Sequence, residues 1–231
     1  MPDIKLRAAD GGQFSAYLAS PAGATGPGVV VIQEIFGVNQ GMRAISDELA
    51  KQGLFALCPD LFWRQEPGVQ ITDKTEAEWA KAMTLLKGFD EKKGIDDMKA
   101  SLAHLRALKG CTGKAGTVGY CLGGRLVYLM ACRSDSDCNV SFYGVGMENN
   151  LDEAKNIRTP TILHIAGKDQ YVPPEAQAKI ARGLAQHPHV TIHVYPNVDH
   201  GFARPGGQHH DRAAADLANK RTADFFRTHL R

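Results

Sequence analysis

Three residues with nucleophilic, acidic and basic side chains each follow an apolar segment of the sequence. Cys121 stands between Gly119 and Gly123, in the Gly-x-nucleophile-x-Gly pattern of a tight strand-to-helix turn. Asp169 and His200 each come shortly after a later apolar segment. A thiol attacks a carbonyl carbon once a histidine has taken its proton, and a carboxylate orients that histidine. These residue types therefore predict nucleophilic catalysis by a Cys-His-Asp triad.

The order of the three residues along the chain, nucleophile then acid then histidine, is the order found in α/β-hydrolases. Each residue also has an alternative interpretation. The turn could hold a buried, inert cysteine; Asp169 could form a turn or a cap; His200 could be a solvated loop residue. Asp199 is the competing acid, but it adjoins His200 in the sequence, so its side chain is expected to point elsewhere.

Apolar segments predict the elements that would position these residues. Strands that alternate with helices predict an α/β fold, here a single α/β-hydrolase domain over 1–231 with a mostly parallel central sheet and helices on both faces. The carboxyl ends of such strands share one edge, where Cys121, Asp169 and His200 would meet. The expected strands are 4–8, 13–18, 28–33, 54–57, 115–120, 140–143, 161–166 and 190–195, and the expected helices are 39–52, 75–89, 95–108, 125–132, 174–186 and 211–230.

Glu34 follows the buried strand expected over 28–33, at its carboxyl end. The residue after this strand commonly supplies one amide of an oxyanion hole, which we assign to Ile35, and the residue after the nucleophile, Leu122, supplies the other. A carboxylate at position 34 would face the nucleophile. The alternative is that Glu34 caps the helix that starts near Asn39.

The composition excludes several function classes. The 231 residues are 43% hydrophobic and 23% charged, and 27 basic against 25 acidic residues leave a net charge of +2, unlike a nucleic-acid binder. No apolar run approaches the roughly 20 residues that span a membrane, and the start of the chain lacks a signal pattern. Five cysteines without a Cys-x-x-Cys pair favour a reducing compartment, so we expect a cytoplasmic protein. The His209-His210 pair has no third ligand nearby, so no metal site is expected.

Together these residues resemble the dienelactone hydrolases, or carboxymethylenebutenolidases. The resemblance covers nearly the whole chain in order, and it is most specific at the cysteine and at the segment that contains Glu34. The matching segments are Gln33-Glu34-Ile35-Phe36-Gly37, Cys58-Pro59-Asp60-Leu61, Gly119-Tyr120-Cys121-Leu122-Gly123-Gly124, Phe142-Tyr143-Gly144-Val145-Gly146, Gly167-Lys168-Asp169 and His200-Gly201-Phe202-Ala203-Arg204.

The resemblance implies catalytic roles for Cys121, His200 and Asp169. It also implies that Glu34 meets the resting thiol and helps to deprotonate it when substrate binds, which would protect the sulfur from oxidation until then. Arg204 matches the arginine that anchors the substrate carboxylate, and a guanidinium suits such an anion. The alternative for Arg204 is an ordinary surface arginine.

The sequence departs from the family pattern in the implied substrate pocket. The family's second carboxylate-binding arginine lies in the helix matching 75–86, which contains no arginine here. Trp79 stands at the matching place and Lys81 is the nearest cation, while Gly201 replaces the family's serine. Trp79 and Phe36 are therefore expected to line the pocket, with half of the carboxylate clamp missing.

The resulting hypothesis is a hydrolase that cleaves a small-molecule ester or enol-lactone such as dienelactone through an acyl-cysteine intermediate. No metal or organic cofactor, nucleic acid or membrane is expected to take part, and the chain could act as a monomer. A broad arylesterase or thioesterase with the same triad is the first alternative. The second is a non-catalytic thiol sensor on a hydrolase scaffold, for which the intact Asp169 and His200 would have no use.

Overall fold

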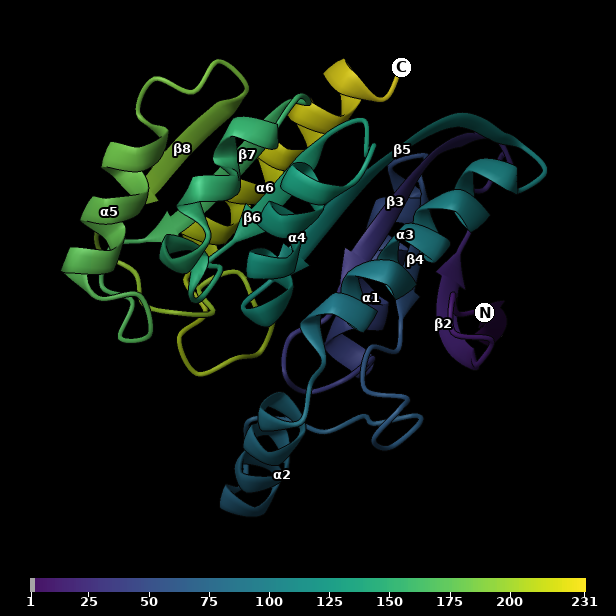
Figure 1. Cartoon of the computed structure of the whole chain (residues 1–231), viewed down its shortest axis with the longest axis horizontal. Coiled ribbons are helices and arrows are strands. Elements are labelled where there is room, and N and C mark those ends of the chain that lie inside the picture. The colour runs from purple at the N-terminus through teal and green to yellow at the C-terminus, as the bar shows by residue number, and fades with distance from the viewer. Residues whose placement is uncertain (1–2) are drawn as a thin grey trace. The chain divides into compact units, whose positions relative to one another are not determined.

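The structure, a computed structural model, describes residues 3–231 (Figure 1). Its packing divides the chain into two compact units, Met1–Gly116 and Thr117–Arg231. Each unit contains strands with helices packed on them, as the alternation of apolar segments predicted. Among the helices of the described residues, none has the length and apolar composition to cross a membrane.

The first unit contains a sheet with the strand order β1-β2-β4-β3. β1 and β2 form an antiparallel pair, β2 is also antiparallel to β4, and β3 is parallel to β4. β3 is a run of small and β-branched residues that is almost wholly buried, which is typical of a strand covered on both faces. The strands are β1 (Asp3–Arg7), β2 (Gln13–Ala19), β3 (Gly26–Ile32) and β4 (Phe55–Pro59).

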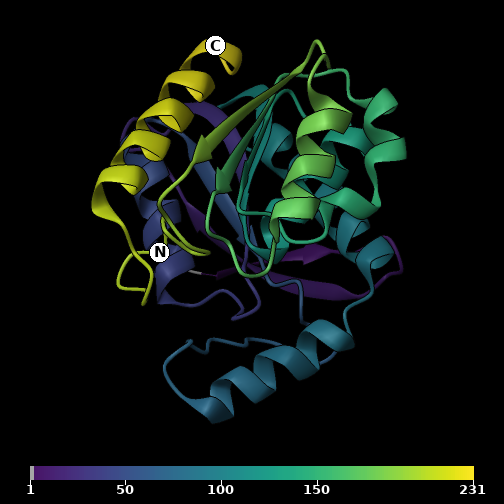
Figure 2. The same ribbon diagram turned by 90° about the vertical axis from the view of Figure 1, so that its left-hand side faces the viewer.

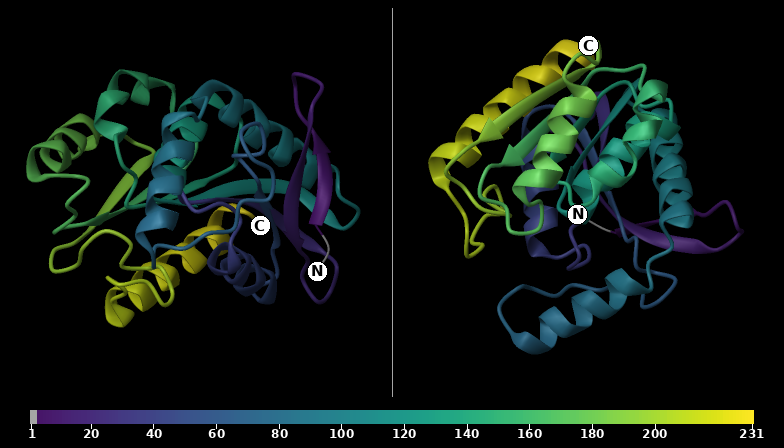
Figure 3. Two further views of the ribbon diagram at one scale, coloured as in Figure 1. Left: turned by 90° about the horizontal axis from the view of Figure 1, so that it is seen from below. Right: turned by 60° about the vertical axis from the view of Figure 1, so that its left-hand side comes forward.

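Two helices cover the sheet of the first unit, and a third lies away from it. α1 (Gln40–Lys51) and α3 (Glu91–Ala107) pack on opposite faces of these strands (Figure 3). α2 (Glu76–Lys87) lies apart from the strands of this unit (Figures 1 and 2). Thr75 caps α2, because its side chain accepts a hydrogen bond from the amide of Glu78.

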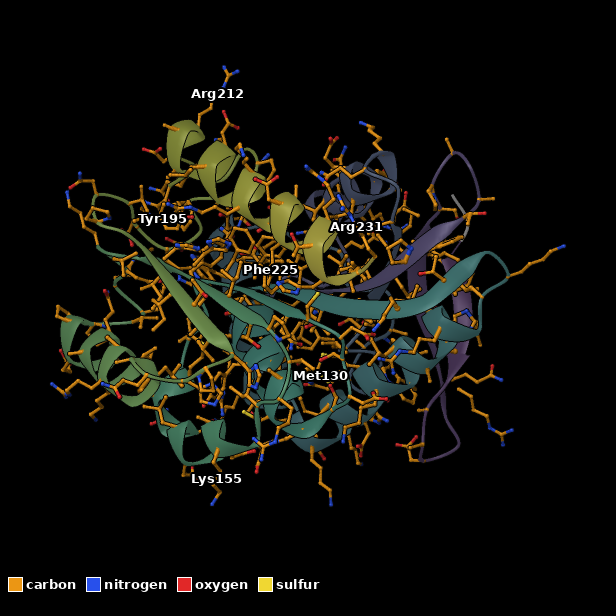
Figure 4. All side chains as sticks on the ribbon, turned by 90° about the horizontal axis from the view of Figure 1, so that it is seen from above. Met130, Lys155, Tyr195, Arg212, Phe225 and Arg231 are labelled. Atoms are coloured by element: carbon orange, nitrogen blue, oxygen red, sulfur yellow. The ribbon has the colours of Figure 1, made fainter. Side chains whose placement is uncertain are left out.

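The second unit is built on parallel strands in the order β5-β6-β7-β8. Right-handed crossovers that advance in one direction place α4 and α5 on the same face. α6 covers the other face, so Met130 on α4 and Phe225 on α6 lie on opposite sides of the strands (Figures 2 and 4). The elements are β5 (Cys111–Tyr120), α4 (Leu122–Arg133), β6 (Asn139–Phe142), β7 (Thr161–Ala166), α5 (Pro174–Leu184), β8 (Val190–Tyr195) and α6 (Arg212–His229).

Every expected strand and helix is present, and the differences lie at element ends. α3 begins four residues earlier than predicted, because the Asp90 side chain accepts a hydrogen bond from the amide of Lys93 and caps it there. β5 also begins earlier, at Cys111. Two 3₁₀ segments, Met147–Asn149 and Leu151–Asn156, were not predicted from the sequence. The extent of a single domain over 1–231 stays a prediction.

Candidate active site

Cys121 lies at the turn between β5 and α4, as predicted. Its backbone has φ 56° and ψ −116°, a conformation that non-glycine residues rarely adopt. Two hydrogen bonds hold the turn: the Cys121 amide donates to the carbonyl of Phe142 (3.1 Å), and its carbonyl accepts from the amide of Arg125 (3.2 Å). The residue is half-buried and stands directly before the first residue of α4.

Close packing at Gly124 and Gly144 brings α4 against the end of β6. A Cβ atom on Gly124 would collide with the carbonyl oxygen of Phe142, and one on Gly144 would lie 2.7 Å from the amide nitrogen of Arg125. Neither contact leaves room for a side chain. The Gly-x-nucleophile-x-Gly pattern contains Gly119 and Gly123, and the structure adds Gly124 and Gly144 as a second, closely packed pair.

Asp169 and His200 form a buried hydrogen-bonded pair. The Nδ1 atom of His200 lies 2.8 Å from the Oδ2 atom of Asp169, and only 6% and 1% of the two side chains are exposed. Because the carboxylate accepts this hydrogen bond, Nδ1 carries a proton. The other carboxylate oxygen accepts from the amide of Tyr171 (2.9 Å), which fixes the orientation of the acid. Both residues follow parallel neighbouring strands, β7 and β8, as predicted.

Asp199, the competing acid, does not bond to the ring of His200. Its Oδ1 atom accepts from the backbone amide of His200 (2.6 Å) and from that of Gln170 (3.4 Å). Its Oδ2 atom lies 3.8 Å from the Nδ1 atom of His209. Asp199 therefore braces the loop, and the ring is oriented by Asp169.

His200 is surrounded by groups that favour its charged form. Burial lowers the pKa of His200, but the charge of Cys121 and the hydrogen bond to Asp169 outweigh it and raise the pKa to about 10. The Nε2 atom is buried and makes no hydrogen bond of regular geometry among the described residues, and Cys121 lies near enough to the imidazole to raise the pKa of His200. This nitrogen is thus placed to exchange protons with the sulfur or with a bound molecule.

Two tyrosines that the sequence analysis did not assign to the site flank His200. The ring of Tyr143 lies 5.0 Å from the imidazole and that of Tyr171 lies 4.9 Å from it, both edge to face. Tyr143 is buried, with φ 39°, whereas Tyr171 is 45% exposed. Tyr143 lies in the family-like segment 142–146, and Tyr171 lies two residues after Asp169. Their closeness to these motifs was the only feature of the sequence that could have placed them in the site.

Arg204 lies over the backbone of the turn that follows His200. A Cβ atom on Gly201 would come within 3.3 Å of the Arg204 guanidinium, and Gly201 has φ +76°. The Arg204 amide donates to the carbonyl of Gly201 (2.9 Å), which closes this turn. Burial and the nearby charge of Cys121 raise the pKa of Tyr171, and the charge of Arg204 opposes that rise. Because Gly201 has no side chain, the Arg204 guanidinium can lie close to the backbone of the His200 loop.

Glu34 and Ile35 follow β3 in the first unit, at its carboxyl end as predicted. Glu34 is buried, with 4% of its surface exposed. The alternative role for Glu34, capping α1, is wrong: Asn39 caps that helix by accepting from the amide of Met42 (3.1 Å), and the first turn of α1 contains no acidic residue. The roles of Glu34 and Ile35 in catalysis stay predictions.

Phe36 and Trp79 contact each other in the first unit. Their ring centroids lie 5.4 Å apart with a tilt of 52°; Phe36 is fully buried and Trp79 is half-buried. Lys81, the cation nearest to Trp79 in the sequence, pairs with Glu66 at 2.7 Å. Both side chains of this pair are exposed, so the pair contributes little to stability.

No group of three metal-binding side chains exists within residues 3–231. The expectation that no metal is needed stays a prediction. His209 and His210 lie in the loop before α6.

Comparison with known sequences gives one consistent family. The family model described as "Dienelactone hydrolase family" matches residues 14–230. The chain is 53% identical over 232 residues to a protein from Azospirillum brasilense that is provisionally named a carboxymethylenebutenolidase, with 100% of both chains covered. It is 38% identical to the carboxymethylenebutenolidase of Pseudomonas putida, covering 96% of this chain and 94% of that protein.

Comparison with solved structures gives the fold. A crystal structure of a provisionally named dienelactone hydrolase from Klebsiella pneumoniae matches with a TM-score of 0.86 at 24% identity, over 98% of this chain and 97% of that one. The Pyrococcus furiosus esterase Pf2001 matches with a TM-score of 0.74 at 14% identity, over 100% and 93%. The prediction of an α/β-hydrolase fold is thereby confirmed.

Proposed function

Because this chain belongs to the dienelactone hydrolase family and is a carboxylic-ester hydrolase of that type, we propose that it works through an acyl-cysteine intermediate formed on Cys121. The observation that carries the proposal is the His200–Asp169 hydrogen bond of 2.8 Å, buried beside the cysteine of a strained strand-to-helix turn. A structural cysteine would need neither this pair nor this turn.

The first step transfers the acyl group to sulfur. The Nε2 atom of His200 takes the proton of the Cys121 thiol, and the raised pKa of His200 favours the imidazolium that results. The sulfur attacks the carbonyl carbon, and the negative charge that forms on the carbonyl oxygen is stabilised by the amide of Leu122 at the start of α4. When the carbon–oxygen bond to the leaving group breaks, the Nε2 atom of His200 gives that oxygen a proton. Ile35 is the predicted source of a second amide.

The second step releases the acid. His200, now neutral and still oriented by Asp169, takes a proton from a water molecule as that water attacks the thioester carbon. The carbon–sulfur bond breaks, the free carboxylic acid leaves, and Cys121 returns as a thiolate beside an imidazolium. Because a thiolate is itself a good leaving group, attack on an unactivated alkyl ester would tend to reverse. Substrates with stabilised enolate leaving groups, such as enol-lactones, are therefore favoured.

The proposed substrate is a small ester or enol-lactone that carries a carboxylate, by analogy with the carboxymethylenebutenolidase relatives. The support in this chain is Arg204, whose guanidinium lies against the turn next to His200. The alternative is an arylesterase or thioesterase without a carboxylate requirement. The observation that favours it is the Phe36–Trp79 contact where the family has an arginine, with Lys81 engaged by Glu66.

Replacing the nucleophile tests the proposed intermediate. Cys121→Ala should abolish hydrolysis of dienelactone and of an uncharged aryl ester, while Cys111→Ala, which removes another partly exposed cysteine, should retain it. Mass spectrometry of acid-quenched wild type should show the acyl group on the Cys121 peptide. Activity of Cys121→Ala near the wild-type level would reject the mechanism. Absence of any ester turnover by wild type would instead favour the thiol sensor.

Replacing Arg204, the proposed carboxylate anchor, distinguishes a substrate that carries a carboxylate from one that does not. Arg204→Ala should raise KM for dienelactone by about tenfold or more, because it removes a charge-assisted contact, and should change KM for an uncharged aryl ester by less than about twofold. Steady-state kinetics on both substrates measure this split. An equal loss on both substrates would show that Arg204 does not anchor a carboxylate, and preferential aryl-ester turnover that is indifferent to Arg204 would favour the alternative function.

A further inference from the structure

A buried polar cluster lies on the α6 side of the second unit, away from the atoms used in the proposed mechanism. We propose that Tyr195, held in place by His164 and Arg221, is a positioning residue that fixes the loop carrying His200. The inference rests on the proposed catalytic role of His200. Tyr195 is the last residue of β8, and Figure 4 labels it on the side of the strands that α6 covers.

The hydroxyl of Tyr195 makes two hydrogen bonds, one with Arg221 and one with His164. Arg221 on α6 can only donate, so its Nη1 atom donates to the hydroxyl oxygen (3.1 Å). In the tautomer of His164 that carries its proton on Nε2, the Nδ1 atom accepts from that hydroxyl (2.9 Å). His164 is neutral and carries its proton on Nε2, 3.2 Å from the hydroxyl oxygen of Thr222. This tautomer gives every polar group of the cluster a partner, and the two hydrogen bonds to the hydroxyl set the orientation of the Tyr195 ring.

The Tyr195 ring supports the far end of the His200 loop. The loop begins after Tyr195, the last residue of β8, and carries His200. Two residues after His200 it brings Phe202 back to Tyr195, and the two ring centroids lie 4.9 Å apart. Phe202 in turn lies 5.5 Å from Tyr143, and Tyr143 lies 5.0 Å from the imidazole of His200. Rings in contact at these separations transmit a displacement, because a packed core has little free volume.

The same tyrosine also ties the histidine loop to the acid loop. The Tyr195 carbonyl accepts from the amide of Gly167 (2.8 Å), and the Val198 carbonyl accepts from the amide of Lys168 (2.9 Å). Asp169 follows directly after these two donors. A shift of Tyr195 would therefore act on both partners of the Asp169–His200 hydrogen bond.

The variant Tyr195→Phe removes the hydroxyl and keeps the ring, so it tests orientation and not bulk. We expect kcat for an activated aryl ester to fall by about fivefold or more with KM within about twofold of wild type, because a misplaced general base slows the chemical steps and leaves substrate contacts intact. The midpoint of the pH profile for alkylation of Cys121 by iodoacetamide, followed on its tryptic peptide, should shift by about half a pH unit or more, because His200 would lie differently relative to the sulfur.

Tyr128→Phe is the matched control. Tyr128 is fully buried in the same unit, on α4, and its hydroxyl donates to the carbonyl of Asn150 (3.1 Å), far along the chain from the histidine loop. The variant Tyr128→Phe should lose about as much free energy of unfolding as Tyr195→Phe, while its kcat and its alkylation profile should stay those of wild type. Equal kcat in Tyr195→Phe and Tyr128→Phe would overturn the inference, whether both are normal or both reduced.

If Tyr195→Phe does not fold, the variant Arg221→Met tests the same inference. Arg221→Met keeps the aliphatic stem and removes one of the two hydrogen bonds to the hydroxyl. A kcat lower by about threefold with an unchanged KM would support the inference, and an unchanged kcat would overturn it. Activity in Cys121→Ala would reject the proposed function itself, whereas an inactive Cys121→Ala beside a fully active Tyr195→Phe would reject only the positioning role.

Discussion

Two carboxylates lie next to His200, and the direction of the chain decides which of them reaches its ring. Asp199 precedes His200, so its side chain leaves the backbone at the same point and caps the His200 amide at 2.6 Å. Asp169 approaches from the end of the neighbouring strand and meets Nδ1 at 2.8 Å. The order of residues along the chain and the placement at strand ends were enough to predict this choice.

At the residue scale, Asp169→Asn should lower kcat for an activated ester by about a hundredfold to ten-thousandfold, because an amide no longer orients the histidine or stabilises the imidazolium. Asp199→Asn retains an oxygen that can accept from the His200 amide, so its kcat should stay within about threefold of wild type. Steady-state kinetics of the two variants at pH 7.5 make the comparison. The reverse order of the two effects would assign the catalytic acid to Asp199.

At the scale of elements, the strained turn at Cys121 depends on how closely α4 packs on β6. Two contacts join the helix start to the end of the strand. The Cys121 amide donates a hydrogen bond to the Phe142 carbonyl, and Gly144 packs against the amide of Arg125. A glycine pair between the helix and the strand end allows the approach. The sequence pattern predicted the turn, but it did not indicate Gly144, because the two glycines meet only when the strands are assembled.

Gly124→Ala tests the importance of this approach. The added methyl group meets backbone atoms of Phe142 and Gly144 that cannot move independently, so we expect a loss of about 1–3 kcal/mol in the free energy of unfolding. A lower kcat should accompany it, because the turn that carries Cys121 must shift. Urea unfolding and kinetics measure the two effects.

The control for that substitution is Gly183→Ala, at another helical glycine. A methyl group there would meet only the Leu151 side chain, at 3.1 Å from its Cδ1 atom, and this side chain can turn away. Stability should change by less than about 1 kcal/mol, since alanine also has the higher helix propensity. A larger loss for Gly183→Ala than for Gly124→Ala would contradict the explanation.

At the scale of the whole molecule, a buried histidine makes stability depend on pH. His164 lies in the core with both ring nitrogens bonded, and burial lowers its pKa to about 3. Its ordinary value is near 6.5, so below that pH the unfolded chain binds a proton that the folded protein does not. The contribution of the neutral ring to stability is therefore complete above pH 6.5 and declines as the pH falls towards 3.

We expect wild type to lose about 2 kcal/mol between pH 7.5 and pH 5 through this residue. His164→Asn cannot take up that proton, so the stability difference between wild type and the variant should narrow by this amount over the same range. Urea unfolding at several pH values measures it. A constant difference between the two proteins would show that His164 is not the source of acid sensitivity.

The sequence by itself determined the alternation of strands and helices, the α/β-hydrolase fold, and the positions of Cys121, Asp169 and His200 at strand ends. These features follow from local patterns: apolar periodicity, turn residues and the order of motifs along the chain. Tertiary structure decided the rest, namely the close approach of Gly124 to Gly144, the contacts of Tyr143 and Tyr171 with His200, and the cluster around Tyr195. Such contacts join residues from different elements, and their distances are set by the register and packing of the strands, which a local pattern does not contain.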